Sequence, residues 1–154
     1  MLEQNDEYWM EFAFKEAEKA YRKDEVPIGA VIVHQNQIIA RGFNQVEMLR
    51  DPTAHAEMLA ITAAAEYLDA RRLLNTTLYV TLEPCSMCAG AIVLSRIPRL
   101  VFGASDPKGG ACGTLFNIVQ DQRLNHRVEV VGGILEKKCS LILSDFFRKL
   151  RETN

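Results

Sequence analysis

The sequence predicts a three-layer α/β/α domain built on a five-stranded mixed sheet. Amphipathic, helix-like stretches alternate along the chain with short runs rich in Val and Ile. The length of 154 residues is close to that of one average domain, so we expect a single domain over residues 1–154. With 48% hydrophobic and 25% charged residues, the composition excludes a disordered chain and a disulfide scaffold.

The first part of the chain predicts a helix followed by a hairpin. Apolar residues such as Trp9 and Ala13 recur at helical spacing in a charged background, which predicts an amphipathic helix over about residues 6–23. The next two runs, 27–33 and 38–42, are short, rich in Val and Ile, and joined by polar residues. They predict two antiparallel strands.

The middle of the chain predicts a helix, a strand and a second helix. The stretch 54–68 is almost continuously apolar, which predicts a helix buried on most sides, and Thr53 is its expected N-cap. A buried strand is expected over 77–82, and Pro84 ends it. The helix 86–95 then begins at a pair of cysteines.

The last third predicts two more strands and a closing helix. Strands are expected over 100–103 and 128–131, with a loop at 106–110 and a helix at 135–151. The two central helices make two strand–helix–strand crossings. These crossings predict that the later strands lie parallel beside the hairpin.

Charge and hydropathy limit where in the cell the protein is expected and what it can bind. The longest apolar stretch, residues 59–65, is far shorter than the roughly 20 residues that cross a bilayer, so we expect no membrane span. The acidic start of the chain is unlike a signal peptide, and a cytoplasmic location is expected. The net charge of −2 means that any role in nucleic-acid binding must depend on local patches.

Two short motifs carry the chemistry. His55 and Glu57 form H-x-E, and Pro84, Cys85 and Cys88 form P-C-x-x-C. Together they offer one imidazole and two thiolates, which is a ligand set that Zn²⁺ prefers. Three protein ligands leave the fourth tetrahedral position open to water, which predicts a catalytic rather than a structural site.

Glu57 is expected to transfer protons rather than to bind the metal. A fourth protein ligand would close the site to water. Residues two apart on a regular helix point about 200° apart. His55 and Glu57 can therefore face one site only if His55 lies in an irregular first turn, which the preceding Pro52 favours.

With these motifs the chain resembles the zinc-dependent nucleobase deaminases of the cytidine-deaminase fold, whose H-x-E and P-C-x-x-C signature assigns the Glu as general acid and base. Within that group it is most similar to the bacterial tRNA-specific adenosine deaminases. The similar segments span nearly the whole chain: 25–30 (EVPIGA), 51–57 (DPTAHAE), 77–91 (TLYVTLEPCSMCAGA), 101–104 (VFGA), 125–128 (NHRV) and 145–148 (DFFR).

The resemblance implies hydrolytic deamination of the wobble adenosine to inosine in a tRNA anticodon loop. A zinc-activated hydroxide would attack the base, with Glu57 as proton shuttle and one Zn²⁺ per subunit of a homodimer. His55, Cys85 and Cys88 would bind the zinc. The resemblance also implies a set of residues that contact the anticodon stem-loop: Asn44, Asp106, Lys108, Phe146, Phe147 and Arg148.

Other interpretations use the same residues. A deaminase of free bases or nucleosides, such as guanine deaminase, shares this chemistry, and a non-catalytic, zinc-stabilised RNA-binding module would keep the metal ligands. Retention of Glu57 argues against the second alternative. Adjacent Phe146 and Phe147 point about 100° apart on a helix, so they cannot share one narrow core stripe. Either one ring is free to stack on RNA, or both rings pack in the core or in a dimer contact. Cys112 and Cys139 are expected to be buried, apolar side chains.

Overall fold

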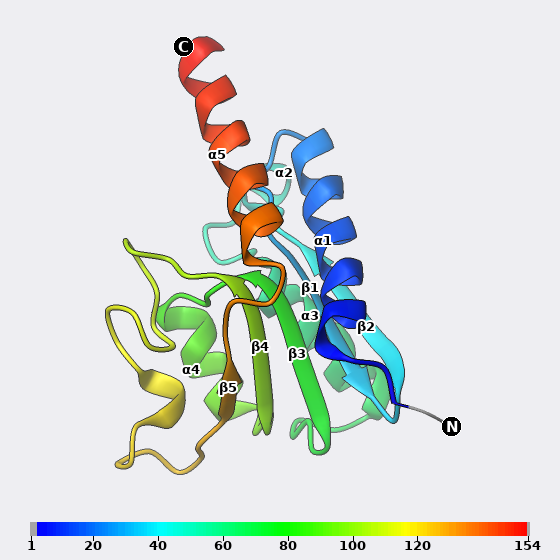
Figure 1. The fold of residues 1–154 in the computed structure, drawn as a ribbon. Helices are drawn as coiled ribbons and strands as arrows, with labels where there is room; N and C mark the ends of the chain where they lie inside the picture. Colours follow the sequence, from blue (N-terminus) through cyan, green and yellow to red (C-terminus); the bar gives the residue numbers. More distant parts are fainter. Residues whose placement is uncertain (1–2, 154) are drawn as a thin grey trace.

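A computed structural model describes residues 3–153 and shows three layers (Figure 1). Helices α1 and α5 cover one face of a central sheet, and α3 and α4 cover the other. The predicted α/β/α architecture is therefore confirmed. In chain order the elements are α1 (Asp6–Arg22), β1 (Gly29–His34), β2 (Gln37–Phe43), α2 (Val46–Leu49), α3 (Ala56–Leu68), β3 (Thr76–Leu82), α4 (Ser86–Leu94), β4 (Arg99–Ala104), η1 (Ile118–Gln120), β5 (Glu129–Val131) and α5 (Glu136–Thr153).

The five strands are ordered β2-β1-β3-β4-β5. The hairpin pairs β1 with β2 antiparallel, and β3–β4 and β4–β5 are parallel. As predicted, the later strands β3, β4 and β5 run parallel to one another beside the hairpin, but the strand to which β3 bonds is β1, and this pairing is antiparallel. The connection through α3 passes over β1, so β3 runs in the direction of β2 but bonds to the strand between them.

Both faces of the sheet are buried. On β1, Ala30 and Ile32 face α3 and α4, whereas Val31 and Val33 face α1 and α5. The same alternation places Leu78, Val80, Leu100 and Phe102 on the first face and Tyr79 and Val101 on the second. Burial on both sides explains why these strands are continuous runs of apolar residues. No helix in the described part of the chain is both long and apolar enough to span a membrane.

The start of the central helix differs from its prediction. The N-cap of α3 is His55, not Thr53, and its backbone is extended (φ −77°, ψ 152°). The Thr53 amide and hydroxyl instead donate to the Asp51 carboxylate, forming a turn before the helix. The short helices α2 and η1 were not predicted, because four- and three-residue turns leave no hydrophobic period.

A glycine sets the distance between α3 and the sheet. A Cβ on Gly42, in β2, would lie 2.4 Å from the Ala56 carbonyl oxygen and 3.0 Å from the Ala60 nitrogen. Ala56, Ala60 and Ala64 are fully buried in the same interface. Small residues on both sides therefore let the first turn of α3 lie directly against the strand.

We expect Gly42→Ala to destabilise the protein by about 1–3 kcal/mol, because the added methyl group meets helix backbone that cannot move aside alone. Thermal unfolding should show a fall of roughly 2–12 °C in the midpoint. Gly90→Ala is the matched control: its Cβ would have nothing within 4 Å, and Ala in a helix is favoured over Gly by roughly 0.5–1 kcal/mol. Equal midpoints for the two variants would contradict this account of the interface.

Candidate metal centre and substrate cavity

Three metal-binding side chains converge where α3 and α4 begin. His55 is the N-cap of α3 and Cys85 the N-cap of α4, while Cys88 lies in the first turn of α4. The His55 Nδ1 atom is 3.6 Å from the Cys85 Sγ atom and 3.5 Å from the Cys88 Sγ atom. All three donor atoms lie within 4.8 Å of one another, so the predicted ligands form one candidate metal site.

The geometry of these donors fits a tetrahedral ion. With Zn–S of about 2.3 Å and Zn–N of about 2.0 Å, tetrahedral angles place sulfur and nitrogen roughly 3.5 Å apart. The two observed distances agree with that value. Because both N-cap residues have extended backbones, their side chains leave the helix ends instead of following the helical period. This irregular start is what the spacing of His55 and Glu57 requires.

Electrostatics at the cysteines favour a thiolate. Hydrogen bonds from Cys88 and His55 lower the pKa of Cys85 to about 3. Donation to Cys85 and burial raise the pKa of Cys88. The hydrogen bond with Cys85 also raises the pKa of His55. The trio thus stabilises negative charge on sulfur, as a site for a divalent cation requires.

Glu57 lies beside these ligands but outside the group of three. Its side chain is 4% exposed, in the first turn of α3. Burial raises its pKa to about 7, partly offset by its own backbone N–H and by His55. Within residues 3–153 the converging donor set consists of His55, Cys85 and Cys88. The arrangement leaves Glu57 available for proton transfer.

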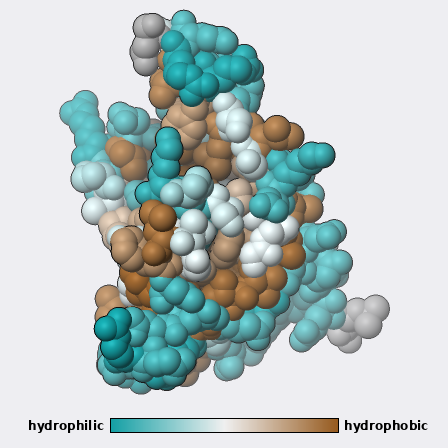
Figure 2. All heavy atoms as spheres, turned by 60° about the vertical axis from the view of Figure 1, so that its left-hand side comes forward, coloured by the Kyte–Doolittle hydropathy of each residue, from teal (hydrophilic) through white to brown (hydrophobic). Residues whose placement is uncertain are grey.

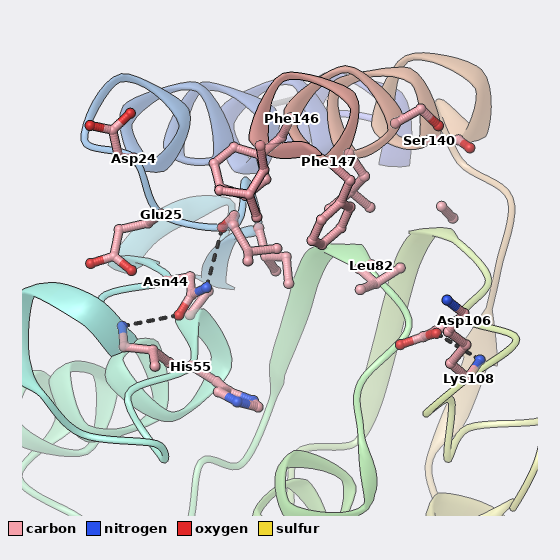
Figure 3. Close-up of a pocket in the computed structure, with 18 of the residues that line it drawn as sticks. Asp24, Glu25, Asn44, His55, Leu82, Asp106, Lys108, Ser140, Phe146 and Phe147 are labelled. Carbon is pink, nitrogen blue, oxygen red and sulfur yellow. Dashed lines mark hydrogen bonds between the residues drawn. The ribbon is translucent and has the colours of Figure 1, made fainter. Parts of the chain in front are cut away.

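A large cavity of about 1430 Å³ reaches this centre at His55, while Glu57, Cys85 and Cys88 lie behind its lining. The ends of β3 and β4 line it through Leu82 and Ala104, and His55 reaches it from the side opposite α5 (Figure 3). On the face in Figure 2, apolar residues gather below the projecting, hydrophilic end of α5. The cavity brings together five of the six residues predicted to contact substrate: Asn44, Asp106, Lys108, Phe146 and Phe147.

Asn44 is held rigidly in the cavity wall. It is 5% exposed, and its Nδ2 atom donates to the Val26 carbonyl at 3.3 Å (Figure 3). Its Oδ1 atom accepts from the Val46 amide at 3.2 Å. One Nδ2 hydrogen and one Oδ1 lone pair remain beyond these two bonds. Asn44 therefore retains both a donor and an acceptor for a base.

The loop after β4 forms the opposite wall. The Asp106 Oδ1 atom accepts from the Lys108 amide at 2.9 Å and from the Gly109 amide at 3.2 Å. These bonds close an Asx turn, which fixes the backbone of the loop. The Lys108 side chain is left exposed at the cavity edge.

Phe146 and Phe147 both line the cavity from α5, but their surroundings differ. Phe146 packs edge-on against Tyr21 with ring centroids 6.0 Å apart, whereas Phe147 is 40% exposed. The structure does not bring Arg148 to the cavity: its guanidinium group pairs with Asp145 and Glu152 on the surface of α5. Asp145 lies three residues before Arg148 and Glu152 four residues after it on the same helix. The basic composition of this segment does not reveal that these carboxylates already bind the guanidinium group.

Several residues of the cavity were missed by the sequence analysis. Lys23 and Arg151 line it, from the end of α1 and from α5. Glu25 and Glu83 are buried carboxylates, 1% and 2% exposed, that bind backbone amides of helix α2 and of the loop after β4, respectively. A charged residue directly after a buried strand, as Glu83 is, was the one signal that could have identified this role.

Comparison with known proteins identifies the family of this chain. A family model described as MafB19-like deaminase matches residues 4–151. The tRNA-specific adenosine deaminase of Bacillus subtilis is 57% identical over 147 residues, which cover 96% of this chain and 91% of that protein. The chain belongs to the tRNA-specific adenosine deaminase family.

Among solved structures, sequence identity rather than fold distinguishes the tRNA deaminases from the guanine deaminases. A structure from a study of A-to-I editing by tRNA:A34 deaminases is 46% identical, with a TM-score of 0.85, and covers 88% of this chain and 99% of that one. A guanine deaminase from Bacillus subtilis is 39% identical but covers 66% of each chain, with a TM-score of 0.63. Sequence identity is therefore higher to the tRNA deaminase, whereas the fold is shared: a guanine deaminase from Nitrosomonas europaea is 24% identical but covers 95% of this chain and 86% of its own, with a TM-score of 0.80.

Removing a thiolate should remove the metal. We expect Cys85→Ala and Cys88→Ala each to lower bound metal from about one ion per chain to near zero, because two ligands hold a divalent ion far less tightly than three. Cys112→Ala is the control: Cys112 is also buried but lies outside the donor set. Elemental analysis of protein purified without chelators measures this. Full metal content in Cys88→Ala would refute the assigned ligands.

Proposed function

We propose that this protein deaminates the wobble adenosine of a tRNA anticodon loop to inosine, with zinc held by His55, Cys85 and Cys88. The observation that carries the proposal is the cavity itself. Its volume of about 1430 Å³ exceeds the roughly 300–1,000 Å³ of ordinary small-molecule sites. A free base needs no more than a small pocket, whereas a loop nucleotide arrives with its neighbours.

The lining of the cavity also favours a strand of RNA. Aromatic side chains from α5 lie opposite the metal centre, and Lys23, Lys108 and Arg151 lie around them. Bases of unpaired RNA stack on aromatic rings while cations contact the phosphates. The names of two related proteins, the one from Bacillus subtilis and the one from the structural study of A34 editing, both give tRNA as the substrate.

The reaction replaces the amino group of adenine by oxygen from water. Bound zinc would supply Lewis acidity that makes a water molecule nucleophilic near neutral pH. Glu57 takes a proton from the water and delivers protons to the ring nitrogen and to the leaving amino group. Water adds at the amino-bearing carbon, the carbon–nitrogen bond breaks, and ammonia leaves. Burial of Glu57 keeps bulk water away from these transfers.

The remaining residues would hold the substrate. Asn44 offers its free donor and acceptor to the flipped base, and the loop containing Asp106 and Lys108 contacts neighbouring nucleotides. Phe146 and Phe147 form the stacking surface. Arg148 stays a prediction, because contact with RNA would require it to leave its two carboxylate partners. We further propose a single cytoplasmic domain that works as a homodimer with one zinc per subunit.

The substrate is tested by measuring ammonia release from guanine, adenosine and an adenosine-34 anticodon stem-loop side by side. We expect release from the stem-loop, with inosine in the product RNA, and none from the free compounds. The stem-loop offers neighbours that stack, each worth about 1–3 kcal/mol, which offsets the cost of flipping the target base. Rapid release from guanine and none from the stem-loop would reassign the protein to the free-base deaminases.

Glu57→Gln should separate catalysis from binding. Turnover should fall by at least about 10²–10⁴-fold, because the amide cannot carry the protons that the carboxylate moves. Metal content and affinity for the stem-loop should stay unchanged, since the amide has the same shape and is not a ligand. All three are measured on one preparation. Loss of metal together with activity would make Glu57 a ligand and reject this mechanism.

Phe147→Ala should weaken binding of the stem-loop by about tenfold, which is the loss of one base stack. The melting temperature should change little, because the ring is already 40% exposed. Leu141→Ala is the matched control on α5, with a side chain that is 60% exposed and outside the cavity. Fluorescence anisotropy with labelled RNA measures both affinities. Equal affinities of the two variants would remove Phe147 from the stacking surface.

A further inference from the structure

One buried carboxylate holds the loop that forms a wall of the cavity. Glu83 directly follows β3 and is 2% exposed. Its Oε1 atom accepts from the Asp106 amide at 3.0 Å and from the Thr114 hydroxyl. Its Oε2 atom accepts from the amides of Cys112 and Thr114, at 3.0 and 3.1 Å. Four hydrogen bonds therefore tie one side chain to both ends of the segment 106–114.

The charge on Glu83 is compensated by this loop alone. Within the described residues, no Lys, Arg or His side chain forms an ion pair with it. Three backbone N–H groups and a hydroxyl form a nest around the carboxylate, as in anion-binding loops. A carboxylate buried without such donors is costly, so the loop cannot leave Glu83 without a penalty.

The contact is so close that one position of the loop needs glycine. A Cβ on Gly110 would lie 2.5 Å from the Glu83 carboxyl carbon and 2.6 Å from the Asp106 carbonyl oxygen. Gly110 also anchors the loop internally, because its amide donates to that same carbonyl at 3.0 Å. The loop is thus wrapped around the carboxylate rather than lying beside it.

We propose that Glu83 is a positioning residue that holds Asp106 and Lys108 in place for the RNA. It lies two residues before the metal ligand Cys85 and bonds to the amide of Asp106, so one side chain joins the metal centre to the wall that would contact neighbouring nucleotides. This role rests on the proposed function. It assigns to Glu83 an effect on substrate binding rather than on the metal or the chemical step.

The test is Glu83→Gln, because the amide keeps the shape and replaces one acceptor by a donor. In the less costly orientation the NH₂ group takes the place of Oε1, since the Thr114 hydroxyl can turn to accept while the two other amides keep their acceptor. The Asp106 amide is then the group that loses its partner. We expect KM for the anticodon stem-loop to rise about tenfold, with kcat changed less than about threefold and zinc content unchanged.

Two further variants keep the test decisive. Thr114→Val removes the hydroxyl bond alone, and KM should rise about threefold, so the role can be measured even if Glu83→Gln does not fold. Thr76→Val is the control: its buried hydroxyl donates to the Leu73 carbonyl at the opposite end of β3. It should lower the melting temperature and leave KM unchanged, since it loses a buried hydrogen bond far from the loop.

A double-mutant cycle shows whether Glu83 acts through the loop. Asp106→Ala keeps the backbone amide that Glu83 binds but removes the carboxylate that this amide positions and that closes the turn at Lys108. In this background Glu83→Gln should raise KM by less than about twofold, because the side chain through which Glu83 acts is already absent. Additive effects, an unchanged KM in the single variant, or loss of zinc would each overturn the proposal. Wild-type protein that leaves the stem-loop unmodified would instead refute the proposed function. An active wild type with an unaffected Glu83→Gln variant refutes the positioning role alone.

Discussion

Two helices that begin at the same point on one face of the sheet are the constraint on which the site depends. The N-caps of α3 and α4, His55 and Cys85, both have extended backbones, so their side chains point off the helix ends toward each other. Unpaired N–H groups and the positive ends of both helix dipoles meet there and stabilise thiolate. The contact of α3 with β2 at Gly42 fixes one helix, and the strand β3 leads directly into the other.

Two buried carboxylates, Glu25 and Glu83, fix the backbone of the cavity walls beside the candidate metal centre. Glu25 accepts from the amides of Glu47 and Met48, at 3.0 and 2.7 Å, and so holds α2 beside Asn44. Glu83 does the same for the loop opposite. Glu25 binds N–H groups at the start of the short helix α2, and Glu83 binds N–H groups of the loop after β4; neither set has partners within its own segment. The walls of the cavity are therefore pre-organised without a large apolar contact between them.

The layers, the five strands and the convergence of His55, Cys85 and Cys88 could be predicted from the sequence, because each depends on local pattern: a hydrophobic period, or two motifs whose residue types suit one ion. The sequence could not predict that β3 would pair with β1, since pairing depends on which strand the α3 crossing passes over. Glu25 and Glu83 stand in motifs that the sequence analysis used, but neither residue could be given a role, because their hydrogen-bond partners lie 22 to 31 residues away in the sequence. Arg148 was included in the predicted site because its neighbourhood is basic, while the ion pairs that occupy it depend on helical geometry.

The distribution of charge around the cavity bears on the proposed binding of RNA by a chain of net charge −2. On α5, Arg148 and Lys149 lie against Asp145, so the basic end of the chain is largely neutralised within its own helix. The cations that line the cavity, Lys23, Lys108 and Arg151, come from three separate segments. Phosphate contacts bind any nucleic acid, whereas stacking and base contacts require an unpaired, flipped nucleotide. With three cations lining the cavity, we expect the proposed binding to depend mainly on the second kind of contact, which disfavours the duplex RNA that a strongly basic surface would also hold.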